Sequence, residues 1–354
     1  MEELFAKYQI KDEVVAVGVS GGADSLALVL QAAEELAVFG RKIVALTVDH
    51  DLRPTSRLEA EYVAGLMQKY GIEHHILTWT GKKPTTGIEE AARQARYALI
   101  AEWCSQNNVH VLLTAHHAKD QAETFLMRLQ RGSGLEGLCG IREYSVRDGL
   151  VILRPLLAVN PENLRDYLRQ RAIVWVEDES NRDTTFLRGK IRQYLPELTE
   201  NIGINIEKIC NAVHNLQSAE DYIEQQLDLL LAHDVIWDFG TVCRFRYADY
   251  LSWHKEMKFR VLARLCRREY IPRAERILAL VNALNTLPFT GATLGGREIV
   301  LAYDWVWVVP ERISKRVQSR KLWAEFVLQH PLYKNIKMPH KAKLAILQKV
   351  GVKK

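Results

Sequence analysis

Residues 14–30 constrain the fold of this 354-residue chain more than any other stretch. They begin with the apolar run VVAVGV, pass through a short turn of small and polar residues, and continue as an apolar-rich segment. A run of Val and Ala is typical of a strand buried on both faces of a parallel sheet. The stretch therefore predicts a strand, a tight turn and a helix in that order.

The turn has the features of an anion-binding loop and consists of Ser20, Gly21, Gly22, Ala23, Asp24 and Ser25. Adjacent glycines let the chain turn tightly and bring backbone N–H groups close to a ligand. Ser25 is expected at the helix start, where free N–H groups and the helix dipole favour anions. No Gly-Lys-Ser/Thr follows, so this is not a Walker loop. Two glycines alone would suit an ordinary strand–helix turn, but the flanking serines and the inserted aspartate favour a cradle for phosphate.

Strand and helix patterns alternate through the first half of the chain, which predicts a doubly wound α/β domain with a parallel sheet. The expected strands cover 14–19, 43–48, 74–79 and 109–114, and the expected helices cover 25–39, 56–70, 87–107 and 120–131. Ligands bind outside the carboxyl ends of such strands. Three polar groups fall at those ends, over 20–25, 49–50 and 116–120.

The second half predicts a different architecture. A less regular zone over 132–160 precedes a short helix over 161–171, and helical periodicity covers about 198–232 and 255–287. After Pro288 the pattern becomes β-like, and the Trp305 and Trp307 pair is expected in a core. The segment 344–350 fits either a short helix or a disordered basic arm. We expect a catalytic domain over 1–215, followed by a helical region and a small α+β domain over 216–354.

Composition excludes several classes of protein. No apolar stretch reaches the roughly 18 residues that a membrane span needs, and the acidic N-terminus lacks an apolar signal core. The five cysteines are scattered and none forms a CxxC pair, so neither a disulfide framework nor a cysteine metal site is indicated. We therefore expect a cytoplasmic protein without a membrane partner.

Basic residues are concentrated towards the C-terminus, although the formal net charge is only +5. From Arg312 onward the only acidic residue is Glu325, and a further arginine cluster lies over 260–276. Such a distribution attracts phosphodiester backbones and makes binding dependent on salt. A tail kept for solubility is the alternative.

The segment SGGADS resembles the PP-loop of the ATP-pyrophosphatase superfamily. Further segments resemble the tRNA(Ile)-lysidine synthase family: VDHDLR at 48–53, AARQARY at 91–97, TAHHAKDQAETFLMRLQRGSGLEGL at 114–138, LRPLL at 153–157 and EDESNRDTTFLRGKIR at 177–192. The LGG within 293–299 is similar to that family's C-terminal domain. The resemblance is dense over about the first 195 residues and looser beyond them.

This resemblance implies a fold of the adenine nucleotide alpha hydrolase type and a specific reaction. ATP and Mg²⁺ would adenylate the C2 oxygen of the wobble cytidine in an isoleucine tRNA with a CAU anticodon. The side-chain amine of L-lysine would then displace AMP. The product, lysidine, would let the tRNA read AUA. The enzyme would act as a monomer or homodimer.

The resemblance also implies roles for the acidic residues. Loop amides would hold the β- and γ-phosphates while Asp24 helps to position Mg²⁺, which uses carboxylates together with substrate phosphates. Asp120 and Glu123 lie three apart at a helix start and point the same way. They would bind the lysine ammonium groups or act as metal ligand and base, with helix capping as the alternative. Asp49 would be a metal or substrate carboxylate.

Basic residues receive roles in the same way. Arg93 and Arg96 share one helical face and could neutralise phosphate charge, unless they are simply exposed helix arginines. His116 belongs either to the nucleotide pocket or to fold packing. Basic side chains near the cleft would face tRNA or phosphates: Arg154, Arg188, Lys190 and Arg192. Turn and N-cap duties explain Asp178, Asn181 and Asp183 almost as well as function does.

The chain departs from the family pattern at three positions. Lys119 stands where the family often has Asp, so Asp120 is expected to be the functional acid of this pair. Lys119 itself is expected to make a peripheral contact with phosphate or tRNA. Asp51 replaces the usual Gly of the DHGLR motif, and Gly189 replaces the usual Asn after Arg188. Because none of these positions is in the phosphate loop, we expect an active enzyme with locally altered loop geometry.

Two other functions compete with this interpretation. A PP-loop tRNA thiolase would also adenylate a base, but enzymes related to 2-thiocytidine formation usually carry paired CxxC cysteines, which this chain lacks. A non-catalytic RNA-binding protein with a vestigial nucleotide fold is the other alternative. The intact loop over 20–25, together with Asp120 and Glu123, favours an enzyme.

The substitution Asp120→Asn tests the assigned acid. It should abolish turnover while leaving tRNA binding largely intact, because the side chain keeps its size and loses only its charge. Pyrophosphate release and tRNA affinity measured on the same preparation check this. A parallel loss of tRNA affinity would contradict the assignment.

Overall fold

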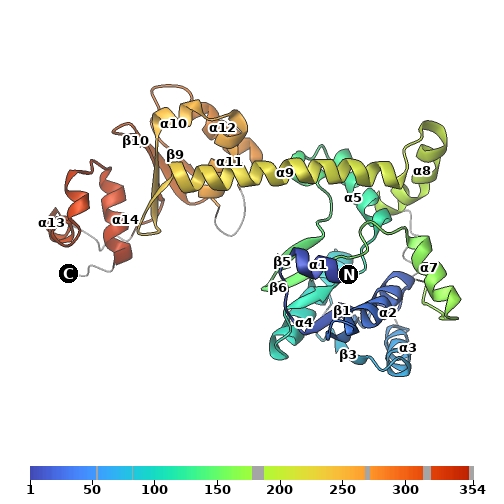
Figure 1. Ribbon diagram of the computed structural model, residues 1–354. Helices are drawn as coiled ribbons and strands as arrows, with labels where there is room; N and C mark the ends of the chain where they lie inside the picture. Colours follow the sequence, from blue (N-terminus) through green and yellow to red (C-terminus); the bar gives the residue numbers. More distant parts are fainter. Residues whose placement is uncertain (53–54, 82, 178–186, 268–271, 314–319, 351–354) are drawn as a thin grey trace. The chain divides into compact units, whose positions relative to one another are not determined.

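The computed structural model describes the chain except for residues 53–54, 82, 178–186, 268–271, 314–319 and 351–354 (Figure 1). It consists of two compact units, Met1–Glu220 and Asp221–Lys354. The division falls within one helix, α9 (Ile206–Asp234). Each unit is described below by itself.

Unit 1 is built on a six-stranded sheet in the order β3-β2-β1-β4-β6-β5. Its strands are β1 (Val14–Gly18), β2 (Lys42–Asp49), β3 (Glu73–Thr78), β4 (Val111–Leu113), β5 (Tyr144–Arg147) and β6 (Leu150–Leu153). All neighbours pair in parallel except β5 with β6. The predicted doubly wound sheet is confirmed.

Helices cover both faces of this sheet. On one face lie α1 (Glu2–Lys7), α2 (Ala23–Ala37), α3 (Ser56–Lys69) and α7 (Pro161–Gln170), and on the other lies α4 (Ile88–Gln106). Successive β1 side chains alternate between the two cores, since Val15 and Val17 pack with α2 whereas Ala16 packs on the α4 side. Both faces being buried explains why β1 is an unbroken apolar run.

The structure differs from the prediction at two places in unit 1. The helix after the phosphate loop begins at Ala23, with Gly22 as its N-cap, so Ser25 lies within the first turn rather than at the start. The zone expected to be irregular contains the β5–β6 hairpin and the short helix α6 (Leu135–Leu138). The strand β5 alternates polar and apolar residues over only four positions, whereas β4 is recognisable as an apolar run.

Three helices form a separate cluster in unit 1. The cluster joins α5 (Ala118–Gln130), α8 (Leu187–Ile202) and the start of α9 through Ala122, Leu195, Ile209 and Val213. These buried contacts hold α8 against α5. They thereby determine which side chains of the two helices face each other.

Unit 2 contains a five-stranded antiparallel sheet in the order β7-β8-β11-β10-β9. Its elements are β7 (Ile236–Asp238), β8 (Val242–Arg246), α10 (Tyr247–Ser252), α11 (Lys255–Leu265), α12 (Ala274–Leu284), β9 (Ala292–Leu294), β10 (Arg297–Ala302), β11 (Trp305–Pro310), α13 (Arg320–Gln329), the 3-10 helix η2 (Pro331–Asn335) and α14 (His340–Val350). The α+β architecture expected after the helical region is confirmed.

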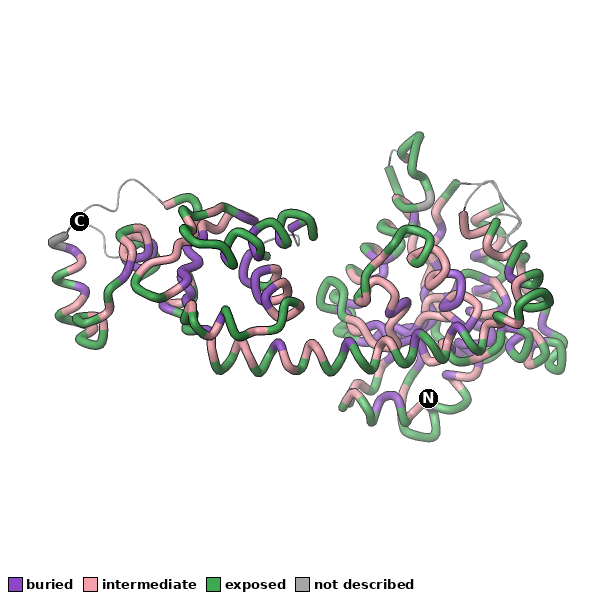
Figure 2. Tube along the Cα trace, turned by 90° about the horizontal axis from the view of Figure 1, so that it is seen from above, coloured by how far each residue is buried: buried purple, intermediate pink, exposed green. Residues whose placement is uncertain are grey.

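Both faces of the second sheet are buried. Val306 and Val308 pack with α10–α12 and the end of α9, whereas Trp307 and Val309 pack with α13 and α14. Trp307 is fully buried, as expected, and Ile346 of α14 lies in the same core, so the short-helix alternative for 344–350 is confirmed. Figure 2 shows that buried residues, in purple, occur within each of the two units. Among the helices described, none is long and apolar enough to cross a membrane.

The glycine motif near the C-terminus has a steric explanation. Gly295 lies in the turn between β9 and β10 with φ +57°, and a Cβ built there would lie 1.9 Å from the carbonyl oxygen of Cys266. Neither the backbone conformation nor the space admits a side chain. This part of the family resemblance therefore reflects packing within unit 2.

The substitution Gly295→Ala should destabilise the chain by about 3 kcal/mol or more, since overpacking adds to the backbone strain. Gly240→Ala is a matched control in the same unit, because Gly240 has φ +64° but nothing within 4 Å of a built Cβ. The control should lose only about 1–2 kcal/mol. Denaturant unfolding of the full chain measures the free energy of unfolding of both variants. Equal decreases would show that the backbone around Cys266 moves aside at little cost.

Candidate active site

The candidate site lies where the strand order of the first sheet reverses. β1 pairs with β2 on one side and with β4 on the other. In open parallel sheets a crevice forms outside the carboxyl ends of the strands at such a point. The loop over 20–25 leaves β1 there, and the segment 114–120 leaves β4.

The phosphate loop is held by its own hydroxyl groups. The Ser25 hydroxyl donates to the Gly22 carbonyl at 3.0 Å and accepts from the Ser20 backbone N–H at 3.1 Å. Gly21 has φ +84°, and a Cβ there would lie 3.2 Å from Val63 Cγ2. The Val176 N–H donates to the Gly21 carbonyl at 3.0 Å. These contacts shape the loop in advance of any ligand, as a phosphate cradle requires.

Asp24, in the first turn of α2, has two different carboxylate oxygens. Oδ2 lies 3.4 Å from His117 Nε2. Oδ1 is buried and has no hydrogen-bond partner among the described residues. A buried carboxylate oxygen without a donor is costly unless a ligand satisfies it. Its position in a phosphate loop fits Mg²⁺, which takes one or two carboxylates plus phosphate oxygens.

The start of α5 is fixed by a capping box. His117 is the N-cap, and its Nδ1 accepts from the Asp120 backbone N–H at 3.3 Å. The Asp120 Oδ2 in turn accepts from the His117 N–H at 3.1 Å. The capping alternative weighed for Asp120 is therefore realised, and it leaves the other oxygen, Oδ1, free to face α8.

Glu123, one turn further along α5, forms an ion-pair cluster with α8. Its side chain is 0% exposed, and its two oxygens accept from Arg188 Nε at 2.7 Å and Arg192 Nε at 2.5 Å. Arg188 Nη2 also reaches Asp120 Oδ1 at 3.2 Å. Burial opposes a charge on Arg192, but Glu123, Asp120 and Asp24 outweigh it and raise the pKa of its guanidinium.

These contacts bear on the predicted tRNA-binding arginines. Arg188 and Arg192 are turned towards carboxylates of the site. Arg154 is buried and donates to the Arg142 carbonyl at 2.8 Å and the Ser145 hydroxyl at 3.0 Å. All three guanidinium groups are engaged within unit 1, so their predicted tRNA contacts would require these contacts to change.

The carboxyl end of β2 contributes a further group. Asp49 is buried and accepts from the Asp51 N–H at 2.9 Å.

The two predicted arginines of α4 contact neighbouring rings. Arg96 Nη2 lies 3.4 Å from His50 Nε2, and burial lowers the pKa of His50 to about 4. Arg93 stacks on Tyr97 of its own helix, 5.4 Å from the ring centroid.

His116 is held as a neutral base at the end of β4. Its Nδ1 lies 3.1 Å from the Thr114 hydroxyl. Burial lowers the pKa of His116 to about 4; Asp120 opposes this effect, while Arg154 and Arg93 reinforce it. His116 is thus uncharged at neutral pH and lies within electrostatic reach of Asp120, Arg154 and Arg93.

All three departures from the family pattern are described residues, and Gly189 lies in the first turn of α8. Asp51 adopts φ +50°, the left-handed conformation that glycine takes readily and that Asp tolerates better than most residues. Lys119 occupies the first turn of α5, half-buried beside Asp120. Asp178, Asn181 and Asp183 lie outside the described residues.

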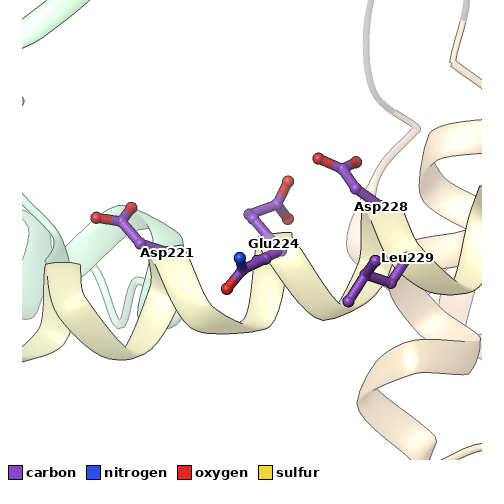
Figure 3. A pocket seen from close by; sticks show the side chains of 5 residues that line it. Asp221, Glu224, Asp228 and Leu229 are labelled. Atoms are coloured by element: carbon purple, nitrogen blue, oxygen red, sulfur yellow. The ribbon is translucent and has the colours of Figure 1, made fainter. Parts of the chain in front are cut away.

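One predicted basic cluster is partly neutralised within unit 2. A pocket on α9 is lined by Asp221, Glu224, Gln225, Asp228 and Leu229, and Figure 3 shows its acidic side chains along the helix. Arg260 Nη1 donates to Glu224 at 2.7 Å, and Arg264 reaches Glu224 at 2.5 Å. This pocket contains none of the residues predicted for the site.

Comparison with known proteins decides the family. A model described as the PP-loop domain matches residues 1–198. A tRNA(Ile)-lysidine synthase of Bradyrhizobium diazoefficiens is 42% identical over 346 residues, covering 90% of this chain and 95% of the relative. One of Hyphomonas neptunium is 36% identical over 321 residues, covering 86% and 83%. The chain belongs to the tRNA(Ile)-lysidine synthase family.

A solved structure supports the fold of this lysidine synthase family member. The U34-tRNA thiolase NcsA of Methanococcus maripaludis is similar with a TM-score of 0.52 at 16% identity, covering 61% of this chain and 77% of that protein. At that identity the likeness concerns the fold alone. The predicted PP-loop fold and the predicted family are both confirmed, and membership of the family implies the use of ATP.

Sequence reasoning missed the link between Asp24 and Asp120 through His117. The spacing of His117 and Asp120 is that of a capping box, which was a usable local signal. The pairing of Glu123 with Arg188 and Arg192 offered no such signal, since it depends on how α8 docks.

The substitution Glu123→Gln should destabilise the chain by about 3 kcal/mol, because it leaves two arginines without their buried counter-charge. Glu61→Gln is the matched control, since Glu61 pairs with Arg57 at 2.9 Å on the surface, where such pairs contribute about 1 kcal/mol or less. Denaturant unfolding compares the two. A loss for Glu123→Gln no larger than the control would mean that the buried cluster adds nothing beyond a surface pair.

Proposed function

We propose that this chain ligates L-lysine to C2 of the wobble cytidine in tRNA(Ile) with a CAU anticodon. ATP adenylates the base with release of pyrophosphate, and lysine then displaces AMP to give lysidine. The observation that carries the proposal is the buried Asp24 oxygen, which has no hydrogen-bond partner among the described residues and lies in the phosphate loop of a member of this family.

ATP is held by the loop over 20–25. Backbone N–H groups at the start of α2 and the Ser20 hydroxyl face the phosphates, since the dipole of that helix favours negative charge at this end. Asp24 would hold Mg²⁺ through Oδ1, and a bound Mg²⁺ would neutralise phosphate charge. Arg93 and Arg96 add positive charge from α4, and His116 lines the nucleotide pocket as a neutral donor or acceptor.

The two carboxylates of α5, on Asp120 and Glu123, have different roles. The side chain of Asp120 is 16% exposed, whereas that of Glu123 is 0% exposed. Asp120 is therefore the carboxylate that meets the lysine amine or a metal ion. Glu123 orients Arg188 and Arg192, and the positive charge of these two arginines stabilises phosphate charge as it develops. Asp49, at the carboxyl end of β2, is a further carboxylate that binds the substrate or a metal ion.

Lysine attacks as the free amine, so its ammonium must lose a proton before the carbon–nitrogen bond forms. A carboxylate in hydrogen-bond reach of the amine favours this loss. The amine nitrogen bonds to C2, and the bond from C2 to the adenylated oxygen breaks with AMP as the leaving group. Prior adenylation makes that oxygen a good leaving group.

The basic residues of the chain supply non-specific attraction to tRNA. Lys119 makes a peripheral phosphate contact, and Arg154, Arg188 and Arg192 complete the surface when substrate rearranges their present contacts. The enzyme works in the cytoplasm, as a monomer or homodimer.

A PP-loop thiolase is the rival with the same first step. Sulfur delivery by enzymes of the 2-thiocytidine type uses paired cysteines, and none of the five cysteines of this chain stands in a CxxC pair. The lysidine synthase relatives cover nearly the whole chain, which favours ligation of an amine.

One assay tests the proposal. Purified protein is incubated with ATP, Mg²⁺, lysine and isoleucine tRNA bearing CAU, with methionine tRNA of the same anticodon as the control. Pyrophosphate release should require lysine and occur on the isoleucine tRNA alone. Release that is indifferent to lysine, or that occurs equally on both tRNAs, would refute the proposal.

A further inference from the structure

His117 has no role in the proposed chemistry, yet it occupies the centre of the site. Its side chain is 9% exposed and lies between the phosphate loop and the start of α5. It contacts Asp24 and Asp120, which lie in the first turns of the helices that follow β1 and β4. It is therefore the physical link between the two halves of the crevice.

The two ring nitrogens of His117 have different tasks. Nδ1 accepts the Asp120 backbone N–H at 3.3 Å, so it carries no proton. The ring proton is then on Nε2, which lies 3.4 Å from Asp24 Oδ2. The neutral imidazole with its proton on Nε2 therefore satisfies both contacts. Each contact also holds the ring in the orientation that the other contact needs.

The contact decides how the Asp24 carboxylate is turned. With Oδ2 facing the imidazole N–H, the other oxygen is directed to the buried position where it has no partner among the described residues. A short carboxylate side chain in a first helical turn would otherwise rotate towards solvent or towards nearby backbone N–H groups.

We infer that His117 is a positioning residue that presents the free oxygen of Asp24 to the metal–nucleotide complex. It does so through Nε2, while its Nδ1 independently caps α5 and fixes the backbone of Asp120. The inference rests on the proposed function for the identity of the nucleotide.

Two substitutions separate the two nitrogens. His117→Asn retains an oxygen near the Nδ1 position, and Asn is a preferred N-cap, but it cannot reach Asp24. His117→Gln places an amide near the Nε2 position and can donate to Asp24, but it is a poor cap. His117→Ala removes both contacts.

The measurements are ATP affinity with and without Mg²⁺, and the thermal midpoint of unfolding. His117→Asn should keep the midpoint of the native chain yet weaken ATP binding in Mg²⁺ about tenfold, the effect expected for a charge-assisted hydrogen bond. His117→Gln should show the reverse, with a lower midpoint and nearly native affinity. Without Mg²⁺ the affinities of the native chain and of His117→Asn should differ little.

A double-mutant cycle with Asp24→Asn then asks whether His117 acts through Asp24. Once Asp24 is changed, His117→Asn should cause no further loss of ATP affinity. Additive losses would overturn the inference. So would native affinity of His117→Asn, or equal losses of affinity and stability in the Asn and Gln variants, which would reduce His117 to a structural residue.

The outcome is separable from that of the proposed function. If the native chain releases no pyrophosphate in response to lysine, the proposed function fails. The nucleotide affinities of the variants still decide the role of His117, since binding of ATP precedes any choice of acceptor.

Discussion

The parallel pairing of β1 with both β2 and β4 is the constraint on which the site depends. Each pairing register brings the carboxyl ends of the strands to one edge of the sheet, and the reversal of strand order parts the loops that follow. Residues distant in sequence, such as Asp24 and His117, then lie within reach of each other. Without this topology the small-residue loop would be an ordinary helix start.

The site also requires that its buried negative charges be balanced by positive ones, because water screens them poorly there. Three carboxylates, on Asp24, Asp120 and Glu123, meet Arg188, Arg192 and His117. Burying one charge alone is costly, whereas a well-paired set is tolerated. Because the arginines come from α8, docking of that helix and assembly of the acidic centre are coupled.

Much of the first unit could be predicted from the sequence, because buried parallel strands and their glycine turns leave strong local patterns. The phosphate loop, the strand ends and the acidic start of α5 belong to this class. The roles of individual side chains are of another kind. Glu123 and Arg192 meet only through the packing of Leu195 and Val213 against Ala122, and no local pattern specifies that contact. The β5–β6 hairpin was not predicted because β5 mixes polar and apolar residues over four positions and half of it is exposed, so it lacks the apolar run that marks β4.

Unit 2 depends on its last described helix for one of its two cores. The five strands are complete once Pro310 has been synthesised, but Trp307 and Val309 are covered only when α13 and α14 join the sheet. Chains are made from the N-terminus, so a nascent chain passes through a stage with one apolar sheet face bare. Chaperones and proteases act on such surfaces. A message that ended shortly before His340 would therefore yield a protein with its whole first unit but an incomplete second core, which chaperones and proteases would recognise.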